Sequence, residues 1–355
     1  MTKAPTAVIC LSPYSGGMEI DSIKMAKKLA PYSKTILIAK KDHFIANEVS
    51  SNRDEFELET ISFKSNIGPA LIFGARELVK KHGIKNVIFF GASELKSLYF
   101  SFLGLDINLI IRHGTTKSRP KKDWFHRLIY SKVNYHVAIC EHLAKNVSYI
   151  IPLGKATELK VIYSSLTNIS EPKLHPTGNV IQLLHVGRIA KGKGQEDAIL
   201  ACQRLYGENV DFSLTLVGGF DESYKEEFLR FLENCTYKDK IKLVGHTKDV
   251  QSYIHHSDIF LFPSHGEGLS NAFLEALSNN LVCISYDNTS FPELQELGLY
   301  FHTVEDKNIK ALQTKLLEIT YSIGNEQKIC QGNHTLSNLL FSVKTEIQEY
   351  LYLLK

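Results

Sequence analysis

Residues 180–206 read VIQLLHVGRIAKGKGQEDAILACQRLY, and they contain the clearest indication of the fold class. The continuous apolar run Val180–Val186 predicts a strand that is buried on both faces. A turn rich in glycine follows at Gly187–Gly194, and helical periodicity covers Lys193–Tyr206. Strand, glycine-rich turn and helix in this order are typical of a βαβ unit, so the stretch predicts an α/β domain with a parallel sheet.

The same alternation extends over most of the chain. Further strands are predicted at Thr6–Leu11, Thr35–Ala39, Val87–Phe90, Asn108–Ile111, His136–Ile139, Lys160–Tyr163, Phe212–Val217, Ile241–Val244, Asp258–Phe262 and Val282–Ser285. Helical patterns separate most of them, as at Met18–Ala30, Pro69–Lys81, Asp221–Cys235 and Leu269–Asn279. This pattern predicts parallel sheets that helices cover on both faces.

One interruption divides the chain. Ser164–Asn179 contains two prolines, a glycine and several Ser, Thr and Asn residues, which is typical of a linker. The length of 355 residues also favours two domains. We expect an N-terminal Rossmann-like domain over residues 1–168 and a C-terminal one over 169–335, facing a cleft. Residues 336–355 are expected to form a helix that packs back towards the N-terminal domain.

Composition excludes several classes of protein. Hydrophobic residues make up 44% and charged residues 22%, so the chain can bury a large core. No apolar run reaches the roughly 18 residues of a membrane-spanning helix. The six cysteines are dispersed, which argues against a disulfide scaffold and a structural zinc site. The sequence therefore predicts a cytoplasmic protein with reduced thiols.

The turn Gly187–Gly194 is a candidate phosphate site. Its glycines let the backbone approach a ligand, and the helix that follows offers free N–H groups. Arg188 and Lys193 add positive charge that suits a phosphate group. The alternative is a solvated basic turn.

A second candidate segment is Pro263–Leu277, which reads PSHGEGLSNAFLEAL. Glu267 lies in its turn, and Glu275 lies within an apolar helical pattern that predicts a buried carboxylate. A carboxylate accepts two hydrogen bonds side by side, which suits the paired hydroxyls of a ribose. The alternative is a glutamate that is paired with a nearby Lys or Arg.

Together these segments resemble the retaining glycosyltransferases of family four, which have the GT-B fold. The matching residues are Gly187, Arg188, Lys193 and Gly194, the glutamates Glu267 and Glu275 with seven residues between them, Pro263-Ser264, Gly16-Gly17 and His113-Gly114. Two positions depart from the family pattern. Ser164-Ser165 stands where Asn-Gly is usual, and Gly266-Glu267-Gly268-Leu269 stands where the first glutamate often lies in Gly-Phe-Gly.

The resemblance implies a role for each matching residue. Arg188, Lys193 and the backbone N–H groups of Gly16, Gly17, Leu269, Ser270 and Asn271 would hold the donor's diphosphate. Glu275 would bind the ribose, and Glu267 and His113 would contact the donor sugar. For His113 the alternative is a core histidine at a strand end. The resemblance also implies retention of anomeric configuration without a metal or other cofactor, and it favours a UDP-sugar over GDP-mannose.

Charge is divided unevenly between the halves. Residues 1–171 carry 24 Lys and Arg against 15 acids, a net charge of +9, whereas residues 172–355 carry a net charge of −6. Residues 112–132, which we call the basic aromatic segment, hold seven cations and a single acid, interleaved with Trp124, Phe125 and Tyr130. This pattern favours contact with the anionic inner face of the plasma membrane, or alternatively a solvated helix. No nucleic-acid-binding module accompanies the charge.

The sequence therefore predicts a transferase that moves a sugar from a nucleotide-sugar to a glycan or lipid-linked acceptor in bacterial surface polysaccharide or lipopolysaccharide synthesis. Two alternatives stay open, namely a nucleotide-sugar 2-epimerase of the same architecture and a non-catalytic glycosyltransferase-like subunit.

Overall fold

The computed structural model describes residues 3–14, 16–50, 55–166 and 178–355, which form two compact units. Unit 1 comprises Met1–Ser164 and Val343–Lys355, and unit 2 comprises Ser165–Ser342. The predicted domain boundary at 168/169 and most of the predicted linker lie outside the described residues. The C-terminal segment joins unit 1 from Val343, seven residues after the predicted start at 336.

Unit 1 is built on a seven-stranded sheet in the order β3-β2-β1-β4-β5-β6-β7, and every neighbouring pair is parallel. Its strands are β1 (Lys3–Cys10), β2 (Ser33–Lys40), β3 (Glu57–Ile61), β4 (Asn86–Phe90), β5 (Asn108–His113), β6 (Tyr135–Ala138) and β7 (Glu158–Val161). The central strands are buried on both faces, which is why they read as unbroken apolar runs.

Helices cover both faces of this sheet. One face packs against α3 (Pro69–Lys81), α4 (Leu95–Ser101), α5 (Trp124–Tyr130) and α6 (Glu141–Ile150). The other packs against α1 (Gly17–Leu29), α2 (Phe44–Ser50) and α14 (Val343–Leu353). Alternate residues of one strand serve the two cores, as Ile9 and Cys10 of β1 do.

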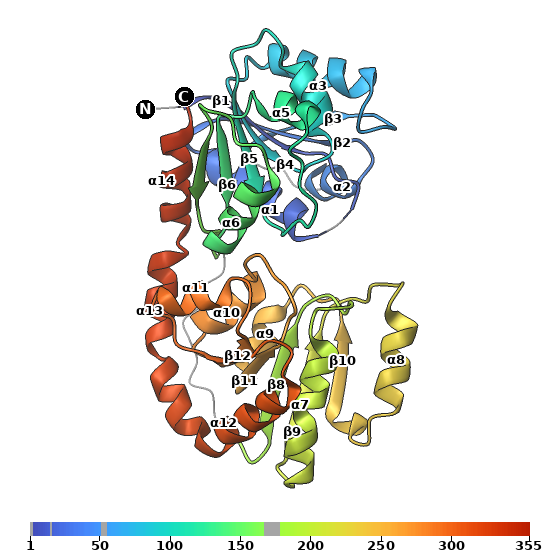
Figure 1. The fold of residues 1–355 in the computed structure, drawn as a ribbon, viewed down its shortest axis with the longest axis vertical. Helices are drawn as coiled ribbons and strands as arrows, with labels where there is room; N and C mark the ends of the chain where they lie inside the picture. The colour runs from blue at the N-terminus through green and yellow to red at the C-terminus, as the bar shows by residue number, and fades with distance from the viewer. Residues whose placement is uncertain (1–2, 15, 51–54, 167–177) are drawn as a thin grey trace. The chain divides into compact units, whose positions relative to one another are not determined.

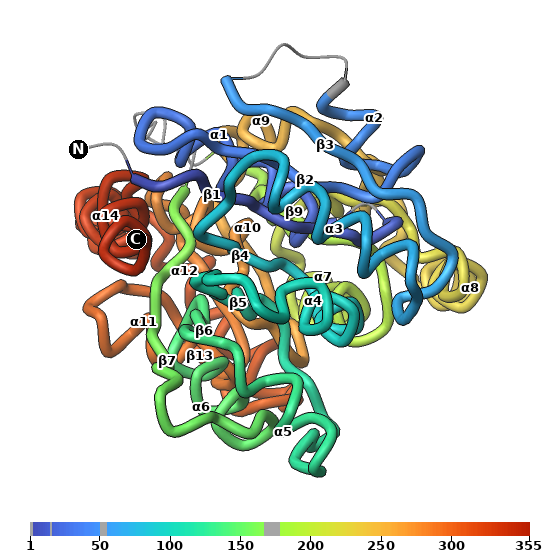
Figure 2. The backbone as a smooth tube through the Cα atoms, turned by 90° about the horizontal axis from the view of Figure 1, so that it is seen from above, coloured from blue at the N-terminus to red at the C-terminus, as the bar shows by residue number. Residues whose placement is uncertain are grey.

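Helix α14 is an integral part of unit 1, and Figure 2 shows it beside the N-terminal strand β1. Its Glu346 pairs with Lys28 of α1 at 2.6 Å, with both side chains largely buried. The backbone N–H of Ala4 donates to the carbonyl of Lys355 at 3.2 Å. Helix α14 and the residues after it therefore belong to the same unit as the N-terminal strand β1.

Unit 2 repeats the architecture with six parallel strands in the order β10-β9-β8-β11-β12-β13 (Figure 1). They are β8 (Ile181–Val186), β9 (Phe212–Val217), β10 (Ile241–Gly245), β11 (Ile259–Phe262), β12 (Val282–Tyr286) and β13 (His302–Val304). The helices are α7 (Gln195–Gly207), α8 (Lys225–Glu233), the 3-10 turn η1 (Lys238–Lys240), α9 (Val250–His255), α10 (Asn271–Ser278), α11 (Phe291–Glu296), α12 (Ile309–Cys330) and α13 (Gly332–Leu340). Helices α7, α8 and α12 share one hydrophobic core.

The two parallel sheets confirm the predicted α/β class with two Rossmann-like units. All six cysteines are free thiols. No helix among the described residues combines the length and the apolar character that crossing a membrane requires.

Candidate functional site

Two loops of unit 2 meet at one edge of its sheet. Strands β8 and β11 are parallel neighbours, with Ile259 opposite Leu183. Gly187–Gly194 follows β8, and Pro263–Ser270 follows β11. Because the carboxyl ends of parallel strands share an edge, the two candidate segments of the sequence are brought together where open α/β sheets bind ligands.

Glycine makes their close packing possible. Gly194 has a φ of +85°, and a Cβ built there would lie 2.3 Å from the carbonyl oxygen of Pro263. The backbone N–H of His265 donates to the carbonyl of Gly192 at 3.0 Å. No side chain fits at position 194, so the first loop lies directly on the second.

An ion pair joins the two predicted motifs. The Nζ of Lys193 lies 2.7 Å from Oε1 of Glu267, and both side chains are half-buried. The hydroxyl of Ser264 donates to the same carboxylate oxygen at 3.3 Å. A partly buried pair with an additional hydrogen bond is better oriented than an exposed one.

Two side chains that the sequence prediction missed donate hydrogen bonds to backbone carbonyls of the first loop, Gly187–Gly194. His185, buried on β8, donates from Nε2 to the carbonyl of Lys193 at 3.0 Å and stacks on Phe262. Burial lowers the pKa of His185 to about 4, so the ring is neutral at physiological pH. Gln195 donates to the carbonyls of Gly187 and Arg188 at 3.4 and 3.0 Å. The sequence feature that could have indicated the role of His185 is a polar residue inside an apolar strand.

Arg188 has a different environment. Its side chain is 64% exposed, and its guanidinium lies 3.9 Å from the carboxylate of Asp221. Hydrogen bonds from Ser223, with a smaller contribution from Arg188, lower the pKa of Asp221. Arg188 is therefore held loosely and can reorient towards a ligand.

The remaining predicted residues of unit 2 lie at the start of α10. Ser270 is the N-cap, and its hydroxyl accepts from the N–H of Phe273 at 3.3 Å. Leu269 is buried, and Asn271 is the first helical residue. Glu275 is half-buried, so the prediction of a buried carboxylate was wrong, because the helix is apolar on one face only.

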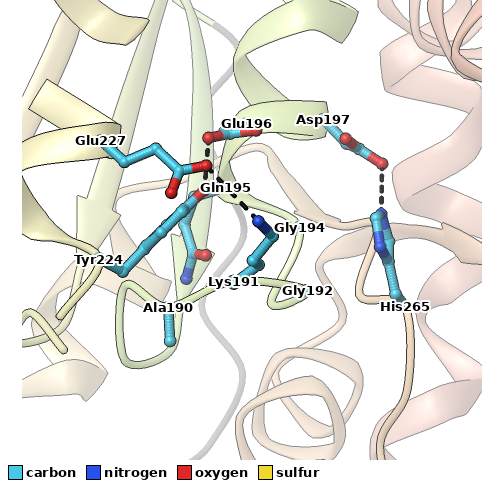
Figure 3. Close-up of a pocket in the computed structure, with 10 residues that line it drawn as sticks. All are labelled: Ala190, Lys191, Gly192, Gly194, Gln195, Glu196, Asp197, Tyr224, Glu227 and His265. Carbon is cyan, nitrogen blue, oxygen red and sulfur yellow. Dashed lines mark hydrogen bonds and ion pairs between the residues drawn. The ribbon is translucent and has the colours of Figure 1, made fainter. Parts of the chain in front are cut away.

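A pocket of about 220 Å³ lies beside the first loop (Figure 3). Its lining is Ala190, Lys191, Gly192, Gly194, Gln195, Glu196, Asp197, Tyr224, Glu227 and His265. Asp197 pairs with His265 at 2.8 Å and accepts from the hydroxyl of Tyr286 at 2.7 Å, while Glu196 accepts from Tyr224. Three carboxylates against the single lysine Lys191 make this pocket unfavourable for a diphosphate, and none of the predicted charged residues lines it.

In unit 1 the predicted glycines begin α1. Gly16 is the N-cap residue and Gly17 the first residue of the helix. A Cβ built at Gly16 would lie 3.0 Å from Oε2 of the buried Glu19, so a carboxylate already faces this loop. That charge opposes the predicted binding of a diphosphate here.

His113 ends β5 and is buried against a second histidine. Its Nε2 lies 2.8 Å from Nδ1 of His136 on β6. Burial lowers the pKa of both rings, that of His136 to about 4. Two neutral imidazoles share one hydrogen bond, which fixes the orientation of both rings. His113 is thus packed at a strand end, as the alternative of a core histidine predicted.

The basic aromatic segment is not uniformly exposed. Arg112 is buried, where it pairs with Asp21 at 3.0 Å and donates to the hydroxyl of Ser164 at 2.6 Å, so its inclusion in a membrane-facing segment was wrong. Trp124 of the same segment, in contrast, is 76% exposed. The exposed cations of the segment are Arg119, Lys122, Arg127 and Lys132.

Comparison with known proteins also points to the part of the chain that contains the two candidate loops of unit 2. Residues 168–327 match the family model of glycosyl transferases group 1. The chain is 26% identical over 240 residues to the capsular polysaccharide biosynthesis glycosyltransferase CapH of Staphylococcus aureus, covering 63% of this chain and 65% of CapH. It is 24% identical over 163 residues to the putative colanic acid biosynthesis glycosyltransferase WcaL of Salmonella typhimurium, covering 44% of this chain and 40% of WcaL. The match thus spans less than two thirds of either relative.

Solved structures resemble the whole chain. A glycosyltransferase from Rickettsia africae superposes with a TM-score of 0.85 at 18% identity, covering 99% of this chain and 98% of the other. Anabaena Alr3699/HepE in complex with UDP-glucose superposes with a TM-score of 0.80 at 15% identity, covering 98% of both chains. The fold is GT-B.

The contact at Gly194 gives a first prediction. Gly194→Ala should destabilise unit 2 by about 3 kcal/mol, since the new methyl group meets the Pro263 carbonyl and the backbone is left-handed. Urea unfolding, followed by hydrogen exchange of the β8 amides, measures the change. Gly207→Ala at the end of α7 is the control, because nothing lies within 4 Å of its Cβ. Equal stability of the two variants would contradict the packing described.

Proposed function

We propose that this protein is a retaining glycosyltransferase of bacterial surface polysaccharide synthesis, which transfers a sugar from a nucleotide-sugar to a glycan or lipid-linked acceptor. The contact between Lys193 and Glu267 carries the proposal, because it joins the two motifs at the ligand-binding edge of unit 2. The match of residues 168–327 to glycosyl transferases group 1 and the polysaccharide-synthesis names of CapH and WcaL support it. The HepE structures with UDP and UDP-glucose favour a UDP-sugar.

In the proposed reaction the bond between the anomeric carbon and the diphosphate oxygen breaks, and its electron pair stays on the diphosphate. In this proposal Lys193 and Arg188 would stabilise this developing charge, together with the N–H groups at the start of α10. Glu267 would hold a hydroxyl of the donor sugar, and Glu275 the ribose. The acceptor oxygen bonds to the anomeric carbon on the face that the diphosphate leaves, and its proton passes to the leaving phosphate.

We further propose that unit 1 docks on an anionic membrane through the exposed part of the basic aromatic segment. Trp124 and Leu128 are exposed on α5, at 76% and 41%, and Tyr149 is exposed on α6. Lys122 lies over the Tyr149 ring with its Nζ 5.8 Å from the centroid. Aromatic side chains beside exposed cations match the chemistry of an anionic lipid interface.

The second prediction tests the phosphate loop. Lys193→Met and Arg188→Ala should each lower the turnover of nucleotide-sugar hydrolysis about 10²-fold or more, because each removes charge that stabilises the leaving group. Lys191→Met is the matched control, since its side chain is 81% exposed in the same loop. Steady-state assays with UDP-sugars and GDP-mannose measure the effect. Unchanged turnover in both variants would refute the site, and release of a C2 epimer would favour the isomerase.

The third prediction separates the two glutamates. Glu275→Gln should weaken UDP binding, since a ribose is held alike in the ground and transition states. Glu267→Gln should mainly lower turnover, because it acts beside the reacting sugar. Calorimetric titration with UDP and initial-rate kinetics distinguish the two effects. UDP affinity of Glu275→Gln equal to that of the wild type would remove the ribose role.

The fourth prediction concerns metal ions. Turnover should be unchanged in excess EDTA, because Lys193, Arg188 and the N-terminus of α10 supply positive charge to the diphosphate. Rates are compared with EDTA alone and with EDTA followed by excess Mg²⁺ or Mn²⁺. Loss of turnover in EDTA that either metal restores would overturn this expectation.

The fifth prediction concerns the membrane. Reversal of Arg119, Lys122 and Lys132 to Glu should weaken binding to anionic vesicles at least about 100-fold, since each cation contributes about 1 kcal/mol. The matched control reverses Lys41, Lys64 and Lys80, which are exposed elsewhere on unit 1. Co-sedimentation at low and high salt, with neutral vesicles for comparison, measures binding. An equal loss in both triple variants would show that only net charge matters.

A further inference from the structure

Lys117 lies in unit 1, four residues beyond the end of β5. This position is at the carboxyl edge of the parallel sheet, where open α/β sheets bind ligands. Lys117 is half-buried, unlike the neighbouring Arg119 and Lys122, which are exposed. The basic aromatic segment therefore contains cations in two different environments, and membrane contact accounts only for the exposed ones.

The backbone at Lys117 is fixed by helix α6. The side chain of Asn146 accepts from the N–H of Lys117 at 3.0 Å and donates to its carbonyl at 2.9 Å. Nearby, the N–H of Lys121 donates to the carbonyl of Ile150 at the end of α6, at 2.8 Å. The two lysines are thus attached to the same helix at separate points, so their backbones are held in place.

Among the described residues, the groups that shift the pKa of Lys117 include no acid. Burial and, to a smaller extent, the charge of Lys121 together lower its pKa to about 8. The nearby rings of His113 and His136 are neutral and contribute no negative charge. Among the residues that the structure describes, no carboxylate forms an ion pair with either lysine. The segment's single acid, Asp123, is engaged by His126.

A half-buried ammonium that lacks a counter-charge has lost hydration without electrostatic compensation. A bound oxyanion would supply that compensation, and the charge of Lys121, which acts on Lys117, would be compensated by the same anion. We propose that Lys117 and Lys121 form a subsite for a phosphate or carboxylate group of the acceptor. The identity of the ligand as the acceptor rests on the proposed function, whereas the oxyanion site itself rests on this geometry.

The test is the reactivity of individual lysines in the full-length protein. The chain is treated at pH 8 with a limiting amine-acetylating reagent, and mass spectrometry gives the rate at each lysine. Inorganic phosphate, acetate and dodecyl phosphate are compared with sodium chloride at equal ionic strength. Below its micellar concentration, dodecyl phosphate represents the lipid-linked source, and the two small anions represent a soluble one.

Bound oxyanion should slow acetylation of Lys117 about fivefold. An opposite charge in contact raises a lysine pKa by at least about one unit, which reduces the neutral fraction at pH 8 from about one half to about one tenth. The rate at Lys64, which is exposed and lies outside the basic aromatic segment, should not change. Protection by the small anions indicates a soluble glycan, and protection by dodecyl phosphate alone indicates a lipid-linked acceptor. Unchanged rates at Lys117 with all three anions, or equal slowing at Lys64, would overturn the subsite.

Two variants separate this inference from the proposed function. In Lys193→Met the protection of Lys117 should persist, because that substitution lies in unit 2. The anions should also slow acetylation of Lys121; in Lys117→Met this slowing should disappear, whereas Lys117→Arg should retain it. Protection without any nucleotide-sugar turnover would keep the oxyanion site and refute the transferase. Turnover without protection would refute only the subsite.

Discussion

The carbonyl of Pro263 leaves no room for a side chain at position 194, and the candidate site of unit 2 depends on this contact. The Cβ of any other residue would lie 2.3 Å from that oxygen. Glycine therefore lets the loop after β8 lie on the loop after β11, which brings Lys193 within 2.7 Å of Glu267. His185 fixes the same turn through the carbonyl of Lys193, and its low pKa keeps the ring from adding a second charge.

The two cations of the candidate site, Lys193 and Arg188, differ in how firmly their side chains are held. Lys193 is half-buried and paired, so its position is set before a ligand arrives. Arg188 is exposed, and its guanidinium lies 3.9 Å from Asp221. A preorganised charge costs little reorganisation during a reaction, whereas a loosely held guanidinium can change position. In the proposed reaction, the fixed Lys193 would therefore act throughout, and Arg188 could follow the diphosphate as it leaves.

The elements that could be predicted are those with a clear local sequence pattern. The central strands and the two loops could be recognised because buried parallel strands are unbroken apolar runs and tight turns require glycine. The edge strand β3, which reads ELETI, was missed because it is half-exposed and polar. Helix α8 begins at Lys225 rather than at the predicted Asp221, since the Asp221 side chain accepts from the N–H of Ser223 and favours a turn. The pairing of His113 with His136 and the clamp of Asn146 on Lys117 join residues distant in sequence, which no local pattern encodes.

The uneven charge of the chain has opposite consequences for its two halves. Residues 172–355 carry a net charge of −6, which would repel the proposed anionic donor at long range. Under the proposed function, attraction of the diphosphate would therefore come from groups in direct contact with it, and contacts shorter than the Debye length of about 8 Å are weakly screened by salt. Residues 1–171 carry a net charge of +9, partly on exposed side chains that act across solvent. Salt should weaken their attraction to an anionic partner much more than it weakens the site built around Lys193. Ionic strength is thus the variable that would separate the proposed long-range attraction by unit 1 from the proposed short-range binding by unit 2.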